Sequence, residues 1–460
     1  MQEIFDFDVT SSIRNINYFV NYGPLPSDLY NIDVISNDEE GIYLEALCRS
    51  IPSQPKNVVP GEITTSEANI VYRDIEGKEV TINGVYITHW QQNFPQHESP
   101  FVRVVLKFGS ISQKVHRHED IYATVENIKN ITDAFKVWPS VIKVKKTRTV
   151  DVGSLNFEVN TTSSSECSSR NNICFDVDGH TVTLIKSNEK LGNGYIVFNG
   201  YVPSNIADKV RDCISYSLGR KLQLISTKYI DKNGRKHGFI ALPELKSLEK
   251  PKLYSTKSPF PLSHQAFTKA INQLYKNYDQ YDLQCIFWSY FHALDAPIDK
   301  RAVYFGATIE ALQKIYLDVN QSKISNKIVT DKPLKRQLLS GFSTIVSSLG
   351  IDDESKKLLM DKKGFINQLP QKVVTKMFFE MLGLDIRELE MTAWQRRNDA
   401  AHGNKVTDGD FVNLIRENLA LHCLFNRLLC SITDASNQYY DYYTYGHPNR
   451  HISSCIPISS

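Results

Sequence analysis

The spacing of hydrophobic positions changes once along the chain, near residue 245. Before this point apolar residues alternate with polar ones, the period of two that is typical of half-buried β-strands. Turn signals interrupt the alternation, and Asp178-Gly179 is the strongest of them because this dipeptide favours a two-residue hairpin. We expect antiparallel strands at residues 68–72, 80–89, 101–108, 173–185 and 222–240, with turns at 76–78, 178–179 and 231–234, and short helices at 126–138 and 204–218.

A proline-rich stretch separates this region from the rest of the chain. Four prolines between residues 243 and 261 lie among lysines and serines, and proline disfavours both helix and central strand, so residues 244–263 are expected to form a linker. After it the apolar residues recur with a period of 3.6, which indicates amphipathic helices. We expect helices at residues 265–278, 282–293, 299–318, 332–349, 355–360, 385–402 and 408–432.

Two of the expected helices carry end signals. Asp299 is expected to cap the start of the helix at 299–318. Asp385 followed by Glu388 has the spacing of a capping box, and Gly403 marks where that helix stops.

These patterns predict an α+β protein, with an antiparallel β-rich N-terminal region followed by an all-α helical bundle. The expected division is a β-rich domain at 1–243, a linker at 244–263, a helical domain at 264–435 and a tail at 436–460. The tail is rich in Tyr, Asp, Pro and Ser, and we assign it no structure. The Ser/Thr/Asn-rich stretch at 160–172 is where the β-rich domain would divide into two sub-domains.

Composition restricts the compartment and the partners. The eight cysteines are scattered and form no CxxC pair, which is typical of a reducing compartment. The first residues, MQEIFDFDVTSS, lack the apolar core of a signal peptide, and no stretch approaches the ~20 apolar residues of a membrane span. We therefore expect a cytoplasmic protein with no membrane partner. The net charge of +2 restricts any nucleic-acid surface to a local basic patch.

The segment from Trp394 to Gly403, WQRRNDAAHG, gathers the candidate chemistry. Asn398 and His402 are four residues apart and therefore share one face of a helix. From there the Asn398 amide can hydrogen-bond the imidazole and set its tautomer. Arg397 lies further round the helix but within reach of the same cleft. A cation there lowers the pKa of His402, which keeps neutral imidazole available as a base near pH 7.

Those residue types suit cleavage of RNA without a metal or another cofactor. The ribose 2′-OH attacks the adjacent phosphate, and a neutral histidine takes its proton. An arginine stabilises the charge that gathers on the phosphorane oxygens, with a fork that fits the oxyanion. The expected products carry a 2′,3′-cyclic phosphate and a 5′-OH, and the nucleophile makes the reaction specific to RNA.

The pattern RNxxxHG at residues 397–403 lies directly before a long terminal helix. It resembles the motif of the HEPN superfamily. Upstream, residues 307–312 (ATIEAL) resemble a helix of the ApeA-like HEPN subgroup, which commonly carries a glutamate where this chain has Glu310. That subgroup joins a β-rich amino-terminal domain to a carboxy-terminal HEPN bundle.

The resemblance implies a metal-independent endoribonuclease with Arg397, Asn398, His402 and Glu310 in its catalytic centre. It also implies a homodimer in which both Arg–His pairs face one cleft, and a toxin or anti-phage role by abortive infection. The substrate would be tRNA or another cellular RNA, and the β-rich domain would restrain the enzyme or sense a phage-derived trigger. The adjacent Arg396 and Arg397 leave open which one faces the site.

Basic residues outside the motif are candidates for RNA contacts: Arg396 beside it, and Lys332, Lys335 and Arg336 on another expected helix. A second basic cluster at residues 143–148 is better interpreted as wet surface.

Each candidate also has an ordinary structural interpretation. Arg397 can be a surface ion-pair partner with His402 as a helix C-cap, and Glu310 can pair with Lys314 one turn away. The whole helical bundle can be a non-catalytic binding or dimerisation module, with ligand recognition in the β-rich domain.

Two other patterns are weaker. Arg416 and His422 have a similar spacing, but His422 lies on the apolar stripe of the last helix, where a satisfied core histidine is the better interpretation. His116 and His118 lack a third ligand at metal-binding spacing, so we expect a solvated turn there.

Overall fold

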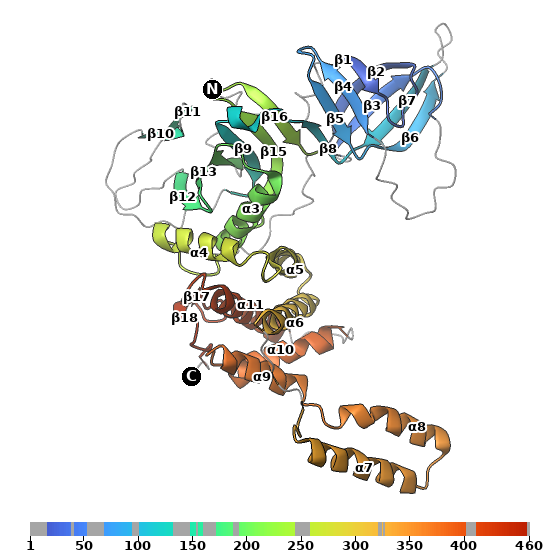
Figure 1. Cartoon of the computed structure of the whole chain (residues 1–460), viewed down its shortest axis with the longest axis vertical. Helices are drawn as coiled ribbons and strands as arrows, with labels where there is room; N and C mark the ends of the chain where they lie inside the picture. Colours follow the sequence, from blue (N-terminus) through green and yellow to red (C-terminus); the bar gives the residue numbers. More distant parts are fainter. Residues whose placement is uncertain are drawn as a thin grey trace. The chain divides into compact units, whose positions relative to one another are not determined.

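The computed structural model describes residues 16–37, 41–52, 69–93, 101–131, 148–152, 155–159, 172–186, 193–243, 258–320, 324, 327–401 and 411–457. The chain divides into two compact units, one of Met1–Lys257 with Leu262–Thr268 and one of Ser258–Pro261 with Lys269–Ser460. Antiparallel strands dominate the first unit and helices the second, so the predicted α+β class is confirmed (Figure 1).

Two antiparallel sheets form most of the first unit. The larger has the strand order β1-β4-β5-β8-β16-β15-β9-β14-β13-β12 and the smaller the order β2-β3-β7-β6, while β10 and β11 pair separately. The strands are β1 Ile16–Asn21, β2 Leu29–Asn37, β3 Gly41–Cys48, β4 Ile70–Asp74, β5 Glu79–Asn83, β6 Tyr86–Asn93, β7 Phe101–Lys107, β8 Ser110–Gln113, β9 Ala123–Lys129, β10 Arg148–Val152, β11 Leu155–Val159, β12 Asn172–Val177, β13 His180–Lys186, β14 Asn193–Asn199, β15 Gln223–Ile230 and β16 Lys236–Ala241, with helix α3 at Ser204–Leu218.

Turn chemistry sets the register of two predicted hairpins. β12 and β13 pair directly across Asp178 and Gly179, whose φ angles of 49° and 78° are the left-handed values that a type I′ turn requires. Between β15 and β16 the Asp231 carboxylate accepts the backbone N–H groups of Asn233 and Arg235, each at 2.8 Å. Both turns lie where the sequence predicts them.

Two groups of buried side chains hold the strands together. The smaller sheet packs on the β4, β5 and β8 side of the larger one, around fully buried residues such as Leu44, Tyr72 and Val104. A second group, which includes Val125 and Val197, lies on β9, β13, β14 and β15. Both groups come from alternate apolar positions, as strands with one buried face require.

The helix expected at residues 126–138 is wrong over its first part. Residues up to Lys129 belong to β9, which lies inside the larger sheet and pairs with β14 on one side and β15 on the other. Covering of both faces explains the error. Glu126 is paired at 2.6 Å with Arg211 of α3, so Thr124 and Glu126 are buried as well as the apolar residues, and the alternation is lost. Residues 132–147, including three lysines of the basic cluster, lie outside the described residues.

The described chain from residue 258 onward contains every helix that the 3.6 period predicts, and α9 besides. α9 escaped prediction because Val373, Met377 and Met381 are exposed and blur the contrast with its buried face. The helices are α4 His264–Lys276, α5 Leu283–Asp295, α6 Arg301–Val319, α7 Lys332–Ser348, α8 Asp353–Asp361, α9 Gln371–Met381, α10 Glu388–Ala401 and α11 Phe411–Thr433, with a 3-10 turn η3 at Lys362–Phe365.

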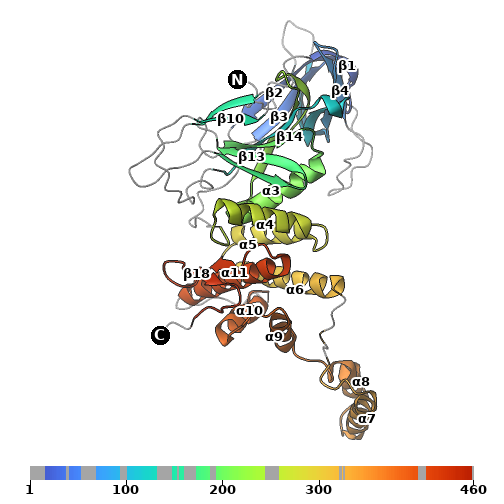
Figure 2. The ribbon, with the colours of Figure 1, turned by 60° about the vertical axis from the view of Figure 1, so that its left-hand side comes forward.

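α11 is the most deeply buried helix of this unit. Its side chains from Ala420 to Cys430 are all buried, which explains why its sequence is apolar or neutral around much of its circumference. α10 packs against both α6 and α11, and α5 packs against α6 (Figure 2). None of the helices in the described ranges combines the length and the apolar character needed to cross a bilayer.

Both predicted helix starts are displaced. α6 begins at Arg301, and its N-cap is Lys300 without a side-chain bond, so the expected Asp299 cap is wrong. At α10 the capping bond runs from the Arg387 backbone N–H to Glu390 Oε2 at 2.9 Å, rather than between Asp385 and Glu388. Glu390 is held in position for this capping bond because Arg427 of α11 also binds its carboxylate. Local sequence spacing does not reveal such a tertiary contact.

Segments expected outside the helical domain are part of its fold. Phe260, from the expected linker, is fully buried, and the Pro259 carbonyl accepts the Tyr440 N–H at 3.0 Å. The tail forms a small antiparallel pair of strands, β17 Gln438–Tyr440 and β18 Asn449–His451, and β17 packs against α11. The tail therefore completes the bundle, while residues 244–257 lie outside the described part of the chain.

Candidate active site

The site begins with the local structure of α10. Met391, Ala393 and Trp394 form its buried face, which fixes the rotation of the helix against α6 and α11. Adjacent residues on a helix point about 100° apart. Arg396 and Arg397 therefore leave the same turn in different directions.

Arg397 points toward α6. Its Nη2 donates to Glu310 Oε1 at 2.5 Å, and its Nη1 donates to the Trp394 carbonyl at 3.3 Å. The guanidinium carbon lies 3.4 Å from the centroid of a Trp394 ring, a stacked cation–π contact. The Glu310 carboxylate, the Trp394 carbonyl and the Trp394 ring thus hold the guanidinium. The Arg397 side chain is only 13% exposed. The structure thus brings together two sequence candidates that lie 87 residues apart.

Gly306 makes this approach possible. A Cβ built at that position of α6 would lie 2.3 Å from Arg397 Cδ and 2.8 Å from its Cβ, closer than atoms can pack. A glycine inside a helix costs about 0.5–1 kcal/mol relative to alanine. Sequence reasoning gave no role to Gly306 or Trp394. The signal available for Gly306 was a glycine in the middle of a strong helical pattern.

Arg396 has a different partner. Its Nε donates to Glu417 Oε2 of α11 at 2.8 Å, so it braces α10 against the next helix. The sequence left open which arginine shares a site with Glu310, and in the structure that arginine is Arg397. The partner of Glu310 in the structure is Arg397 of another helix, 2.5 Å away. The ordinary interpretation from the sequence was a pair with Lys314 of the same helix.

Two further candidates lie at the end of α10. The helix backbone includes Asn398 and continues to Ala401, the last helical residue described. The side chain of Asn398 and the whole of His402 lie outside the described residues. In the sequence, His402 directly follows Ala401, the last described residue of α10.

The expected RNA-contact residues Lys332, Lys335 and Arg336 lie on α7. α7 packs with α8 and η3, whereas Arg397 belongs to the group formed by α6, α10 and α11. The three basic side chains thus belong to a different helix group from Arg397.

Charge and burial at Arg397 oppose each other. Burial lowers the pKa of Arg397, and the neighbouring Glu310 carboxylate raises it again. An arginine stays protonated at neutral pH even so, because its ordinary pKa exceeds 12. The arrangement therefore supplies a fixed cation, partly removed from water, beside a half-exposed carboxylate.

The similar spacing of Arg416 and His422 does not make a second site. His422 is buried, its Nε2 lies 2.9 Å from the Tyr290 hydroxyl, and its ring stacks on Tyr442. Burial lowers its pKa to about 3, so it stays neutral inside the core. Arg416 is exposed and lies over the Tyr443 ring. The interpretation of His422 as a core histidine is confirmed.

His422 is expected to make the protein sensitive to mild acid. Its pKa is about 3 when folded and 6.5 when unfolded, so the unfolded state binds the proton more readily as the pH falls. Between pH 7 and pH 5 this one group should remove about 2 kcal/mol from the free energy of unfolding. Urea unfolding of wild type and His422→Gln, which keeps an acceptor for Tyr290, should show a smaller loss in the variant. Equal losses in both proteins would contradict this assignment.

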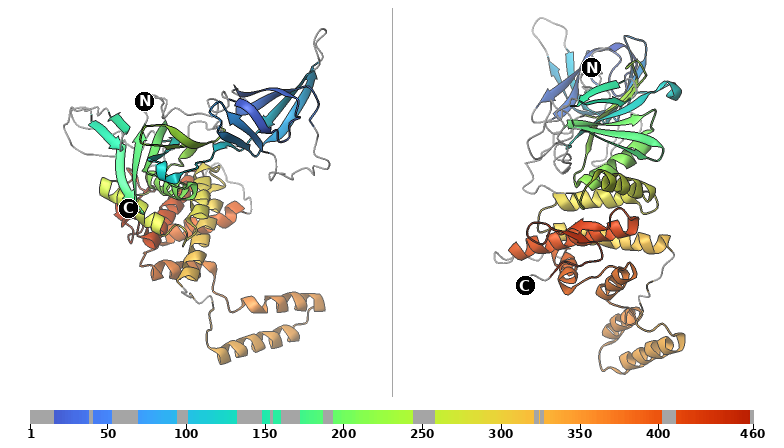
Figure 3. Two further views of the ribbon diagram at one scale, coloured as in Figure 1. Left: turned by 45° about the horizontal axis from the view of Figure 1, so that its top comes forward. Right: turned by 90° about the vertical axis from the view of Figure 1, so that its left-hand side faces the viewer.

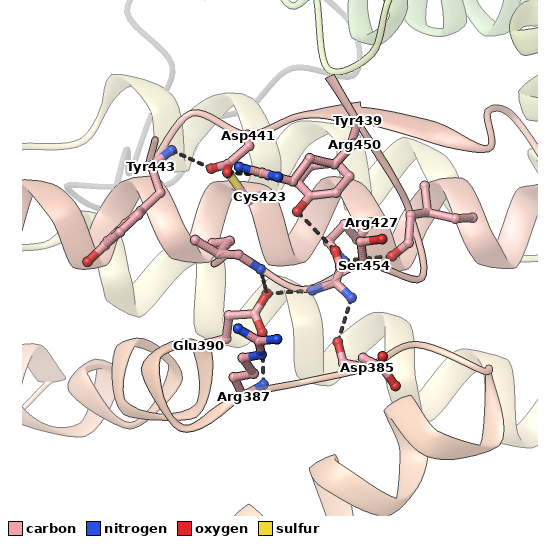
Figure 4. Close-up of polar contacts among 12 residues, drawn as sticks. Asp385, Arg387, Glu390, Cys423, Arg427, Tyr439, Asp441, Tyr443, Arg450 and Ser454 are labelled. Carbon is pink, nitrogen blue, oxygen red and sulfur yellow. Dashed lines mark hydrogen bonds and ion pairs between the residues drawn. The ribbon is translucent and has the colours of Figure 1, made fainter. Parts of the chain in front are cut away.

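A buried ion pair fixes the start of α10 (Figure 4). Arg427 of α11 donates to Glu390 Oε1 and to the Asp385 carbonyl, both at 2.5 Å, and to the Ile452 carbonyl at 2.8 Å. Both charged side chains are fully buried. One guanidinium therefore ties α10, α11 and the tail together, and this sets the direction in which α10 presents Arg397.

The histidines at 116 and 118 belong to the β-rich unit. His118 lies in a 3-10 turn, His118–Asp120, and its ring stacks on Tyr201 with centroids 3.8 Å apart. Both histidines are exposed, which confirms the expected solvated turn. In the ranges that the structure describes, no group of three or more His, Cys, Asp or Glu side chains is arranged to hold a metal ion.

Comparison with known proteins found no match for the chain among family models, curated proteins or solved structures. The function is therefore inferred from the residues of α6 and α10.

Proposed function

We propose that the protein is a metal-independent endoribonuclease of the HEPN type, similar to the ApeA-like subgroup. The observation that supports this proposal is the pairing of Arg397 with Glu310, which joins the motif arginine on α10 to the motif glutamate on α6. The two contacts of Arg397 with described residues use two of the five N–H donors that an arginine has. The remaining donors would bind the scissile phosphate.

In this mechanism each residue has one task. His402 takes the proton of the ribose 2′-OH as that oxygen attacks phosphorus, and later returns a proton to the leaving 5′-oxygen. Arg397 stabilises the charge on the non-bridging oxygens, and Asn398 orients the imidazole. Glu310 does not react; it holds the Arg397 fork in place.

The wider proposal follows the resemblance. RNA, tRNA among it, is the substrate, and the enzyme works as a homodimer in anti-phage defence in the cytoplasm. The β-rich unit restrains the enzyme until a phage-derived trigger acts on it. A nuclease that cuts the RNA of its own cell requires such control.

A non-catalytic bundle is the second candidate, and the contacts of Arg397 favour it in one respect. Stacking on Trp394 and pairing with Glu310 would also stabilise helix packing if no RNA were cut. Cleavage and stability therefore have to be measured on the same variants.

We expect Arg397→Lys to lower cleavage of total RNA and tRNA about 100- to 1000-fold in EDTA, because lysine keeps the charge but loses the fork. The assay compares the variant with wild type, with end-group analysis for 2′,3′-cyclic phosphates. Arg416→Lys, an exposed arginine of α11, is the matched control and should cut like wild type.

Thermal melting of both variants completes the test. A melting temperature close to that of wild type, with cleavage lost, supports catalysis. A lower melting temperature with cleavage per folded molecule unchanged would leave Arg397 as a packing residue only and would overturn its catalytic role.

A further inference from the structure

The tail contains five tyrosines in a short stretch, and the structure divides them between the core and the solvent. Tyr439 and Tyr442 are buried, and their hydroxyls donate to backbone carbonyls at 3.1 Å and 2.6 Å. Tyr445 is 102% exposed, the highest value of any large apolar or aromatic side chain in the described ranges. It lies in the connection between β17 and β18, residues 441–448, which we call the tyrosine loop.

One buried carboxylate holds the tyrosine loop in shape. Asp441 is fully buried and accepts the backbone N–H groups of Tyr443 at 3.1 Å and Thr444 at 3.0 Å. It also accepts the Thr444 hydroxyl at 2.6 Å and Arg450 Nε at 2.7 Å. Figure 4 shows Asp441 between Tyr443 and Arg450. Because the loop is held from within, its exposed ring has little conformational entropy to lose on binding, and such preorganisation favours affinity.

The tyrosine loop lies close to the part of α11 that contacts α10. The tail runs beside α11 (Figure 3). Arg416 of α11 lies over the Tyr443 ring, 4.7 Å from its centroid, and the next residue, Glu417, binds Arg396 of α10 at 2.8 Å. One turn of α11 therefore carries both the contact to the loop and the contact to the neighbour of Arg397.

Tyr443 and Tyr445 differ in how much of each ring is open. Arg416 covers one face of Tyr443, whereas the full exposure of Tyr445 leaves both faces of its ring in solvent. Unpaired bases of single-stranded RNA stack on open aromatic faces, and every base can do so because each has a π face. Tyr445 is therefore the tyrosine of this loop that suits a base.

The charges near Tyr445 in the chain also suit RNA. Residues 442–452 contain no Asp or Glu, and their ionisable side chains other than tyrosine are His447, Arg450 and His451. Asp441, the acid just before them, is buried and paired with Arg450. A phosphate chain can therefore approach the ring without meeting a carboxylate of this segment, which favours binding of a single strand.

We propose that Tyr445 stacks on an unpaired base of the RNA substrate, a base subsite beside the proposed active site. This inference rests on the proposed function, since it names a feature of the RNA that the enzyme would bind. Tyr445 touches a base and not the reacting phosphate, so it contributes to affinity and leaves the chemical step unchanged. It favours single-stranded over fully paired RNA, because the bases of a duplex are not open to stacking.

The test measures binding of RNA that no enzyme of this type can cut. A fluorescein-labelled 2′-O-methyl oligouridylate of about 12 nucleotides lacks the 2′-OH nucleophile and is long enough to span such a site. We expect Tyr445→Ala of the full chain to bind it about 5- to 100-fold more weakly than wild type in fluorescence anisotropy. Tyr445→Phe keeps the ring and should bind like wild type.

Two controls separate stacking from other effects. Tyr30→Ala removes another strongly exposed tyrosine, 78% exposed on β2, and should bind like wild type. A fully paired 2′-O-methyl duplex should bind Tyr445→Ala and wild type equally, since it offers no unpaired base. With RNA that can be cut, Tyr445→Ala should raise KM by a similar factor and leave kcat within about two-fold of wild type. Far-UV circular dichroism checks that the variants fold.

The possible results separate this inference from the proposed function. Weaker binding by Tyr445→Ala with no cleavage by wild type would support the base subsite and contradict the nuclease. Equal binding by Tyr445→Ala and wild type would overturn the subsite and favour a protein as the partner of Tyr445. A wild type that does not bind the oligonucleotide, or a Tyr445→Phe as weak as Tyr445→Ala, would also overturn it.

Discussion

His402→Ala is expected to abolish RNA cleavage, with a loss of about 100- to 10,000-fold, because general acid–base catalysis by a histidine contributes that much. The assay uses purified wild type and variant with total RNA and tRNA in EDTA, followed by end-group analysis. Cutting by wild type alone, with 2′,3′-cyclic phosphate ends, would support both the reaction and the residue.

The matched control is His292→Ala. His292 is a half-buried histidine in the last turn of α5, whose ring stacks on Trp288, and it has no role in the proposed site. Its activity should stay within about two-fold of wild type, as for other surface substitutions away from a site. Equal activity of His402→Ala and wild type would remove His402 from the mechanism.

If neither protein cuts RNA in vitro, the same pair is expressed in cells challenged with phage. Growth arrest that requires His402 would then indicate an enzyme that needs a trigger. No difference between the two proteins in cells would favour the non-catalytic bundle.

The second large effect is expected on stability, from Arg427→Met. Methionine matches much of the arginine stem but leaves the Glu390 carboxylate buried without its cation. Breaking a buried ion pair in this way costs about 3–5 kcal/mol. Urea unfolding followed by far-UV circular dichroism should show this loss of unfolding free energy.

Arg416→Met, on the same helix but exposed, is the control and should change stability by less than about 0.5 kcal/mol. The double variant Arg427→Met/Glu390→Gln should recover part of the loss, because no charge then remains buried. A single variant as stable as wild type would show that the pair does not hold α10 in place.

The fold was predictable wherever one face of an element is buried and the other exposed. The strand β12 before Asp178 and the helix α3 have such patterns. The hairpin around Asp231 was predictable from its turn residues, although β15 is buried over most of its length. β9 was not predictable, since its polar residues are buried as well as its apolar ones, with Glu126 paired to Arg211 of α3. α9 failed for the opposite reason, because apolar side chains occupy its exposed face.

The candidate site shows a similar division. Arg397 could be chosen from residue type and spacing, because catalytic chemistry limits which side chains can act. Glu310 was chosen only through the family resemblance of residues 307–312. Their contact, the Glu417 partner of Arg396 and the choice of Glu390 as the capping residue depend on helices that are distant in sequence. Local patterns hold no information about such contacts.

Gly306 also bears on how this protein can change in evolution. Any side chain larger than hydrogen at that position would occupy the space of the Arg397 stem, so each residue restricts which substitutions the other tolerates. A lineage in which alanine replaced Gly306 would have to lose or redirect Arg397. The two positions are therefore expected to change together in evolution, and Gly306 should be retained wherever Arg397 is retained.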